Sequence, residues 1–476
     1  MRIDRTDPRV QGQGPTEPLP LPRRVSDHGL AIQPTEFAEM PLPPSFYPSA
    51  SLARALVVAA SVLSTTWPLA ARAQSAPAGD ADLDALRARI AAPFMAQPLI
   101  GQQPLVPLAT TARLPAPAGP LQVQASAGFA HDSNVMRAPQ ARSDRLAVLA
   151  LGLRLDKRWS LQRLTLDAEA SAQRFDQFSQ LDHELANYRG AWEWAFTPRL
   201  TGTLSARQTQ LRDFSAVDDG TPLRADLRTE REQLADLRLG GVGAWRLEAG
   251  ASRLRNESDQ ARTLEGNVHI DSTRLGVGHR WPSGLDLALR ARHGQGHYPG
   301  DIGPDFHDEQ VDLVLQLPRR AAWSIDARLG QLQRRHDAQT LRDFEGAVGQ
   351  ARLVWDSGAR TRVEAGLERE LGGYDFGAGG HVRAARAYIA PAWQAGAHTT
   401  LSLRHALEWR RWSTVDPLSP DAERRDRSRG TGLLLDWQPR SWWQLLAQVR
   451  GEQRDSGLAG ARFRATFTSI SIRVTP

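Results

Sequence analysis

Eight short turns, nearly all flanked by an aromatic residue, recur at wide intervals between Asp156 and Ser441. They occupy residues 156–159, 196–199, 240–245, 281–284, 317–320, 355–358, 393–396 and 437–442. Two segments of alternating polarity, joined by a longer polar loop, lie between consecutive turns. Short turns at one end, long loops at the other and an aromatic belt beside the short turns are typical of transmembrane β-barrels. The expected belt consists of Trp159, Trp194, Trp245, Trp281, Trp323, Trp355, Trp393, Trp437 and Trp442.

The segments between the turns alternate apolar and polar residues with a period of two, which places each set on one face of a strand. In one segment, Leu287 and Leu289 alternate with Arg290 and Arg292. A soluble β-sandwich would pack the apolar face into a core, whereas a membrane barrel would turn it toward lipid and line its lumen with the charged face. The charged rows carry both signs, and the segments reach about 10–14 residues against ~5–6 for a typical strand. The pattern therefore favours a barrel over a sandwich or a solenoid.

The alternation predicts an all-β fold, a transmembrane antiparallel up-and-down β-barrel of about 18 strands occupying residues 121–476. An even count places both termini on the periplasmic side, beside the short turns. The long loops then face outward, among them residues 131–143, 214–225, 372–383 and 413–427. A barrel of this size encloses an aqueous channel unless it is plugged. Near the end of the chain, Phe463 and Phe467 keep one phase and Ile470 the other, which predicts a β-bulge between them.

The first 73 residues are expected to be an amino-terminal extension and a Sec signal peptide. An apolar run at residues 55–63 follows Arg54 and ends near a small-x-small cleavage site at residues 71–73. The run is too short for a membrane-spanning helix. Because residues 1–39 are Pro-rich and unpatterned, we hypothesise that translation starts at Met40.

Residues 74–120 are expected to form a separate periplasmic region, a short helix followed by a linker. Residues 80–92 begin with acidic side chains, and Leu83, Leu86 and Ile90 share one face of the predicted helix. The Pro-rich segment that follows is expected to be extended. We interpret the region as a tether or as a contact for periplasmic export components, with a plug of the barrel as the alternative.

The composition excludes cysteine-based chemistry and allows two interpretations of the high arginine content. Cysteine is absent, which suits the oxidising periplasm and excludes thiolate catalysis and Cys-based metal sites. The net charge is +6, and of the 59 Lys and Arg residues only Lys157 is lysine. Arginine binds carboxylates and phosphates in a bidentate manner, so one interpretation is a lumen suited to anionic carbohydrate. The alternative is a GC-rich genome, which encodes arginine by default.

No convincing catalytic set or metal site occurs in the sequence, and we expect a protein without enzymatic activity and without a cofactor. His131, Asp132 and Ser133 have the residue types of a nucleophile triad, but sequence neighbours rarely form one, and a Gly-x-Ser-x-Gly motif is missing. His293 and His297 are four residues apart, which on a strand is too far for one metal ion.

The opening of the predicted barrel carries a resemblance to a known family. Residues 127–137, AGFAHDSNVMR, resemble the Y-D-S-N-L-F-R opening of EpsL-type outer-membrane proteins, a β-barrel porin family encoded with exopolysaccharide biosynthesis genes. Shorter matches follow at residues 143–145, 155–163, 187–202, 342–346, 435–440 and 456–460. The resemblance spans residues 121–476, although His131 stands where the family often has Tyr and Met136 where it often has Phe.

The resemblance implies a barrel that helps an exopolysaccharide to cross, or to assemble at, the outer membrane of a Gram-negative bacterium. Lumen-facing residues that could bind such a polymer are Arg154, Arg189, Glu193, Arg290, Arg292, Arg328 and Arg404. The alternative role for these residues is a ladder of salt bridges that holds a water-filled barrel open. In the first loop, Asp132, Asn134 and Arg137 are expected to fix the loop through turn hydrogen bonds rather than to bind substrate.

Other functions remain open alongside export. They are a general or nutrient-uptake porin, a structural anchor of a secretion complex, and an outer-membrane enzyme, against which the missing catalytic set argues. Expected partners are outer-membrane lipid and lipopolysaccharide, the exopolysaccharide, the barrel assembly machinery and, through residues 80–92, periplasmic export components. The basic stretch at residues 424–429 is interpreted as a loop edge that meets lipopolysaccharide phosphate, not as a nucleic-acid site.

Overall fold

The structure is a computed structural model, and it describes most of the chain from residue 119 onward. The described residues are 119–213, 226–240, 244–259, 267–299, 303–320, 322–357, 360–372, 381–413 and 424–475. The predicted signal peptide, the helix at residues 80–92, nearly all of the Pro-rich linker and the loop at residues 214–225 lie outside these ranges. Within them, no helix is long and apolar enough to cross a membrane.

Each of the segments that alternate in polarity forms a β-strand of 12 to 16 residues. The first half of the strands comprises β1 (Leu121–Asp132), β2 (Asp144–Trp159), β3 (Gln162–Phe175), β4 (His183–Ala195), β5 (Leu200–Asp213), β6 (Asp226–Gly240), β7 (Trp245–Ser258), β8 (Val268–Arg280) and β9 (Asp286–His297). The second half comprises β10 (Phe306–Arg320), β11 (Trp323–His336), β12 (Phe344–Asp356), β13 (Thr361–Gly372), β14 (His381–Gln394), β15 (Thr399–Ser413), β16 (Arg425–Arg440), β17 (Trp443–Ser456) and β18 (Phe463–Val474).

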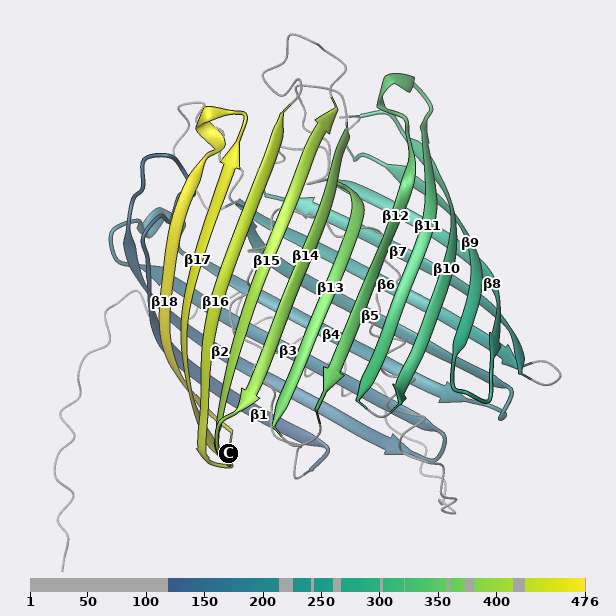
Figure 1. Ribbon diagram of the computed structural model, residues 1–476, viewed down its shortest axis with the longest axis horizontal. Helices are drawn as coiled ribbons and strands as arrows, with labels where there is room; N and C mark the ends of the chain where they lie inside the picture. The colour runs from purple at the N-terminus through teal and green to yellow at the C-terminus, as the bar shows by residue number, and fades with distance from the viewer. Residues whose placement is uncertain are drawn as a thin grey trace, which may run out of the picture. The chain divides into compact units, whose positions relative to one another are not determined.

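The strands form one closed antiparallel barrel. Every strand pairs with its neighbours in the sequence, and β1 closes the ring by pairing with β18 from Ala125 opposite Val474 to Asp132 opposite Phe467. Strands β11–β18 cross the near wall and β2–β7 the far wall with the opposite slant (Figure 1). The expected strand count is therefore confirmed: the sheet has 18 strands. Closure leaves no unpaired sheet edge, which is how a β structure satisfies its backbone in lipid.

The short turns and the long loops lie at opposite ends of the strands, but two of the expected turns were placed wrongly. Strand β2 continues through Trp159, so its turn comes at Ser160 and Leu161, and residues 317–320 belong to β10. Register shifts occur within β10 and β16 beside Pro318 and Pro439. Proline cannot donate a ladder hydrogen bond, which accounts for the irregular pairing at these two positions.

The bulge expected in β18 is wrong. Strand β18 pairs with β17 without a register shift from Val474 to Phe463. The apolar residues in the first half of β18 lie on its inner face, and those in the second half lie on its outer face. The apolar pattern therefore changes phase without a bulge. Ile470 and Ile472 are exposed on the outer face, whereas Phe467 is buried on the inner face, in a cluster with Ala130, Val135, Leu146, Phe175 and Leu181.

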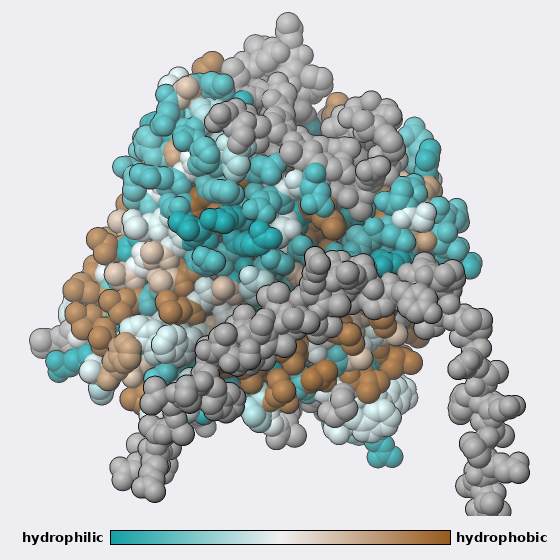
Figure 2. Space-filling model, turned by 180° about the vertical axis from the view of Figure 1, so that it is seen from behind, coloured by the Kyte–Doolittle hydropathy of each residue, from teal (hydrophilic) through white to brown (hydrophobic). Residues whose placement is uncertain are grey.

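The outer face of the barrel carries a band of exposed apolar side chains. Phe129, Leu275, Leu329 and Leu367 are each more than 60% exposed, although they are large and apolar. In Figure 2 hydrophobic residues gather in the lower part of the barrel and hydrophilic residues in the upper part, toward the long loops. A closed barrel with an apolar outer band and charged inner rows is the architecture of a transmembrane β-barrel of the Gram-negative outer membrane.

Candidate functional site

The inner wall of the barrel carries the charged rows, and all of the residues expected to face the lumen lie on it. Strand register and burial place Arg154, Arg189 and Glu193 on the inner faces of β2 and β4, where Arg154 lies 3.5 Å from Asp167. Four further arginines lie on the inner faces of β9, β11 and β15: Arg290, Arg292, Arg328 and Arg404. These residues differ in whether their charged groups already bind partners in the barrel wall or remain accessible from the lumen.

Glu248 on β7 is the centre of the first charge network. Its two carboxylate oxygens accept hydrogen bonds from Arg246 Nε and Arg290 Nε, each at 2.7 Å, and Arg238 Nε lies 3.9 Å away. The Glu248 side chain is only 2% exposed. Arg246 continues the network to Asp286 on β9. Arg290 is therefore engaged with a buried carboxylate two strands away and is not a free cation in the lumen.

A second network surrounds Asp308 on β10. Arg334 on β11 binds both Asp308 oxygens, at 2.7 and 2.9 Å, in the bidentate arrangement that arginine and carboxylate favour. Arg292 lies 3.7 Å from the same carboxylate and donates a hydrogen bond to Gln310 at 2.8 Å. The guanidinium of Arg334 also stacks 3.8 Å from the centre of the Phe306 ring. Because the Arg292 side chain is 4% exposed, a passing solute has little access to it.

The opposite wall repeats the arrangement. Glu408 on β15 accepts hydrogen bonds from Arg386 at 2.7 Å and Arg410 at 2.5 Å. Nearby, the Tyr388 hydroxyl donates a 2.8 Å hydrogen bond to Glu364, and Arg404 lies 3.8 Å above the Tyr388 ring. One carboxylate held between two cationic groups satisfies charges that are costly to remove from water. These networks stiffen the wall between strands that are not all adjacent in the barrel.

Two inner-face arginines, Arg189 on β4 and Arg362 on β13, are exposed and have no side-chain hydrogen bond or ion pair within the part of the chain described above. Arg154 is also accessible, with its side chain 36% exposed. Solutes in the lumen can therefore reach these three guanidinium groups. Arg328, in contrast, is buried in the wall. Of the arginines expected to bind a polymer, Arg154 and Arg189 have the accessibility that binding requires.

The first-loop motif ties the loop to the closing strand. The Asp132 carboxylate accepts hydrogen bonds from the Asn134 backbone N–H and from Arg137, both at 2.9 Å. The Asn134 side chain donates to the carbonyl oxygens of Ala138 at 2.7 Å and of Arg464 on β18 at 3.0 Å. The bonds within residues 132–138 are local turn bonds of the kind that Asp and Asn commonly make, and the bond to Arg464 joins the loop to β18. They fasten the seam at which β1 meets β18.

The tryptophans expected in the aromatic belt lie beside the short turns. Trp323 on β11 is directly opposite Trp355 on β12, with ring centres 5.9 Å apart. Trp442 in the last turn contacts Trp443, with ring centres 6.4 Å apart. Six further members lie at the same end of their strands: Trp159, Trp194, Trp245, Trp281, Trp393 and Trp437. Aromatic rings at this level suit the boundary between lipid and water.

The residues considered for catalysis and for metal binding are not brought together. His131 lies on the outer face of β1 and Asp132 on its inner face, since neighbours on a strand point in opposite directions. His293 and His297 both lie exposed on the outer face of β9, and His297 Nδ1 is 2.7 Å from Asp305. Within the described ranges, no group of three or more His, Cys, Asp or Glu residues could hold a metal ion.

The carboxylates that neutralise the inner arginines are not among the residues predicted from the sequence. Glu248, Asp308 and Glu408 belong to the same alternating rows, so their orientation was readable from the period of two. Their partners were not, because Glu248 reaches Arg290 across an intervening strand and register sets which charges meet.

No protein-family model matches the chain, and no curated protein matches it. Among solved structures, it is similar to Pseudomonas aeruginosa OccK1 (OpdK), at 10% identity and a TM-score of 0.42, over 75% of this chain and 99% of that chain. It is also similar to P. aeruginosa OccK2 (OpdF), at 12% identity and a TM-score of 0.43, over 75% and 98%. Acinetobacter baumannii OccAB3 follows at 10% identity and a TM-score of 0.39, over 75% and 99%. At these values the assignment as a barrel rests on the chain's own strand pairing.

Proposed function

We propose that the protein is an outer-membrane porin, a water-filled channel that conducts polar solutes and favours anions weakly. The observation that carries this proposal is the charged inner wall of a closed 18-stranded barrel. Barrels of this strand number leave an aqueous channel unless something plugs them. Enzymatic activity is not part of the proposal.

The expected anion preference is weak because most inner arginines are neutralised within the wall. Arg290, Arg292 and Arg334 each face a buried carboxylate at close range. The accessible guanidinium groups of Arg189 and Arg362 remain to act on a solute. Selectivity should therefore follow these two side chains and not the arginine content of the chain.

The test is single-channel conductance of protein purified from outer membranes and placed in planar bilayers. We expect a steady conductance whose reversal potential in a salt gradient shows a preference for anions. Replacing Arg189→Ser together with Arg362→Ser should shift that potential toward cations, whereas Arg253→Ser on the outer face should leave it unchanged. Absence of conductance would overturn the channel, and an unchanged reversal potential in the double variant would overturn the role of the two arginines.

Export of an exopolysaccharide is the second candidate function. The observation that favours it is the resemblance of residues 127–137, and of shorter segments up to residue 460, to EpsL-type proteins. The accessible Arg154 and Arg189 are suited to pair with the uronates or phosphates of an acidic polymer. On this proposal, residues 80–92 recruit periplasmic export components, and the protein could equally serve as the outer-membrane anchor of their complex.

Two measurements separate export from general diffusion. Purified polymer from the native host should block the conductance if the lumen carries it, and should leave the conductance unchanged if the protein is a general porin. Deleting residues 80–92 should leave barrel insertion intact and reduce polymer at the cell surface. Unchanged surface polymer would reject recruitment through this segment.

A further inference from the structure

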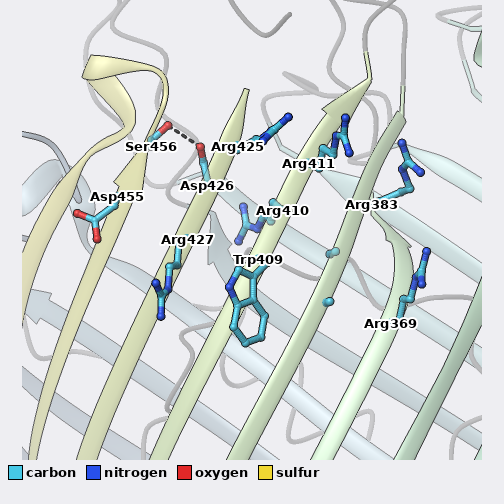
Figure 3. A pocket seen from close by; sticks show the side chains of 12 residues that line it. Arg369, Arg383, Trp409, Arg410, Arg411, Arg425, Asp426, Arg427, Asp455 and Ser456 are labelled. Carbon is cyan, nitrogen blue, oxygen red and sulfur yellow. Dashed lines mark hydrogen bonds between the residues drawn. The ribbon is translucent and has the colours of Figure 1, made fainter. Parts of the chain in front are cut away.

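Five arginines gather on the outer face of four adjacent strands, close to the long loops. They form the β13–β16 arginine patch, which consists of Arg369, Arg383, Arg411, Arg425 and Arg427. All five are exposed, and they line a pocket of about 480 Å³ together with Trp409 and Asp455. Figure 3 shows the guanidinium groups pointing out from the strands around this pocket. Arg383, Arg425 and Arg427 were predicted to lie in loops, but they lie on strands β14 and β16.

The strand register sets three of these arginines in a direct row. Arg383 on β14 is opposite Arg411 on β15, and Arg411 is opposite Arg425 on β16. Side chains directly opposite each other have Cβ atoms about 4.5–5.5 Å apart, and like charges at this distance destabilise a sheet. Two successive arginine–arginine pairs are an unfavourable arrangement unless an anion lies among them.

None of the five guanidinium groups has a hydrogen bond or ion pair with another side chain in the described ranges. The two nearby carboxylates are already engaged. Asp426 points to the inner face and is bound by Arg424 at 3.0 Å and by Ser456. Asp455 accepts a hydrogen bond from Gln453 at 2.9 Å. Asp455 is directly opposite Arg427 and keeps its negative charge, so it offsets one of the five arginines, and the patch retains an excess of positive charge.

Elsewhere on the outer face, several arginines near the long loops have partners. Arg253 on β7 lies 2.6 Å from Asp271 on β8, and Arg231 on β6 lies 2.8 Å from Glu257 on β7. On β16 itself, Arg429 donates a 2.7 Å hydrogen bond to Gln453. Arg255 on β7 is likewise exposed without a side-chain hydrogen bond or ion pair in the described ranges, so what distinguishes the patch is that five such arginines surround one pocket.

The patch lies directly above the apolar band. Leu367, Ile389, Leu403 and Leu433, one on each of the four strands, are between 40% and 63% exposed on the outer face. Trp409 is exposed in the same row as Arg369 and Arg427, on the band side of the other three arginines, where an aromatic ring suits the boundary of the bilayer. A ligand that fits both parts has an anionic head and apolar chains.

We propose that the β13–β16 arginine patch binds the phosphate groups of a glycolipid of the outer leaflet, with the acyl chains against the apolar band below it. Arginine suits phosphate because its planar fork donates two hydrogen bonds in parallel, and a bound phosphate removes the repulsion along the row. Inorganic phosphate would satisfy the arginines but leave the apolar surface uncovered. The site is on the outside of the barrel and does not depend on what passes through the lumen.

The test is lipid binding to the full-length protein after purification from outer membranes, exchange into detergent and reconstitution in phosphatidylcholine nanodiscs. Diphosphorylated lipid A is titrated, and the bound fraction is measured by native mass spectrometry. We expect one lipid A to bind, and we expect Arg383→Ser, Arg411→Ser and Arg425→Ser together to weaken binding about tenfold or more, since several charge-assisted hydrogen bonds are lost. Arg253→Ser, an outer arginine outside the patch, should change affinity less than about twofold.

Folding is verified by the heat-dependent mobility of the barrel on a gel, and Arg411→Ser alone supplies the test if the triple variant does not fold. Equal affinity of the triple variant and the wild type would overturn the proposal. Equal binding of lipid A from which the phosphates have been removed would show a purely apolar groove and would also overturn it. Displacement of lipid A by inorganic phosphate at a similar concentration would show a free-phosphate site instead.

Discussion

Arginines at two places in the barrel wall, the Glu248 network on the inner face and the β13–β16 arginine patch on the outer face, differ in whether a carboxylate neutralises them. On the inner face, Glu248 lies between Arg246 and Arg290, and its side chain is almost fully removed from solvent. On the outer face, Arg383 and Arg411 are opposite each other with no carboxylate between them. The same residue type therefore serves as a cross-brace inside the barrel and as an unneutralised surface outside it.

This difference changes the meaning of the net charge of +6. An excess of arginine predicts an anion-attracting lumen only if the excess lies in the lumen. Here the inner rows interleave arginine with carboxylates, and a concentrated excess of positive charge lies on the outer face of β13–β16. The global charge of a barrel is therefore a poor guide to its selectivity, and the pairing on each face has to be known.

The largest change in stability should come from breaking the charge network around Glu248 on the inner face. Glu248→Gln removes the charge shared by Arg246 and Arg290 while keeping the shape of the side chain, so Arg290 loses the carboxylate that it binds and Arg246 keeps only Asp286. We expect the free energy of unfolding to fall by about 3–5 kcal/mol. Urea titration of the folded barrel in lipid vesicles, followed by tryptophan fluorescence, measures the change. A loss below about 1 kcal/mol would mean that the brace contributes as little as an exposed pair.

The brace itself shows what the sequence can and cannot predict. Alternation put Arg290 and Arg292 on the charged face and Leu287 and Leu289 on the apolar face, and the burial along β9 follows that pattern. The strand count is correct for the same reason, because lipid outside and charge inside enforce a period of two on every strand. The local sequence alone therefore predicts which face of the barrel wall a side chain lies on.

The local sequence does not predict which charged residues pair across strands. Glu248 meets Arg290 only because β8 holds β7 and β9 in a particular register, and a shift of one residue would move either side chain to the other face. The ends of strands are also set by pairing. Arg383, Arg425 and Arg427 looked like loop residues in the sequence, yet the ladders of β14 and β16 extend to include them. The outer patch was invisible until these strand ends were known.

A smaller effect of opposite sign should come from the outer patch. Arg383→Glu places a carboxylate directly opposite Arg411 and turns a like-charge pair into an ion pair. In vesicles of neutral phospholipid we expect the barrel to gain about 0.5–1 kcal/mol of unfolding free energy. Arg369→Glu is the matched control, because Arg369 faces Ala385 on β14 and Gly349 on β12 and gains no cross-strand partner. Equal gains in both variants would point to net charge instead of the arginine row.

The smallest effect should come from a glutamate on the outer face of the same strand as Glu248. Glu257 on β7 lies 2.8 Å from Arg231, and both side chains are more than 40% exposed. Glu257→Gln is the same chemical change as Glu248→Gln, but water solvates the arginine that is left behind. We expect a loss below about 1 kcal/mol that disappears in high salt, whereas the loss at Glu248 should persist because salt does not reach a buried pair. Urea titration of both variants at low and high ionic strength makes the comparison. A salt-sensitive loss at Glu248 would mean that water fills the inner wall at that level, and that its arginines are available to solutes after all.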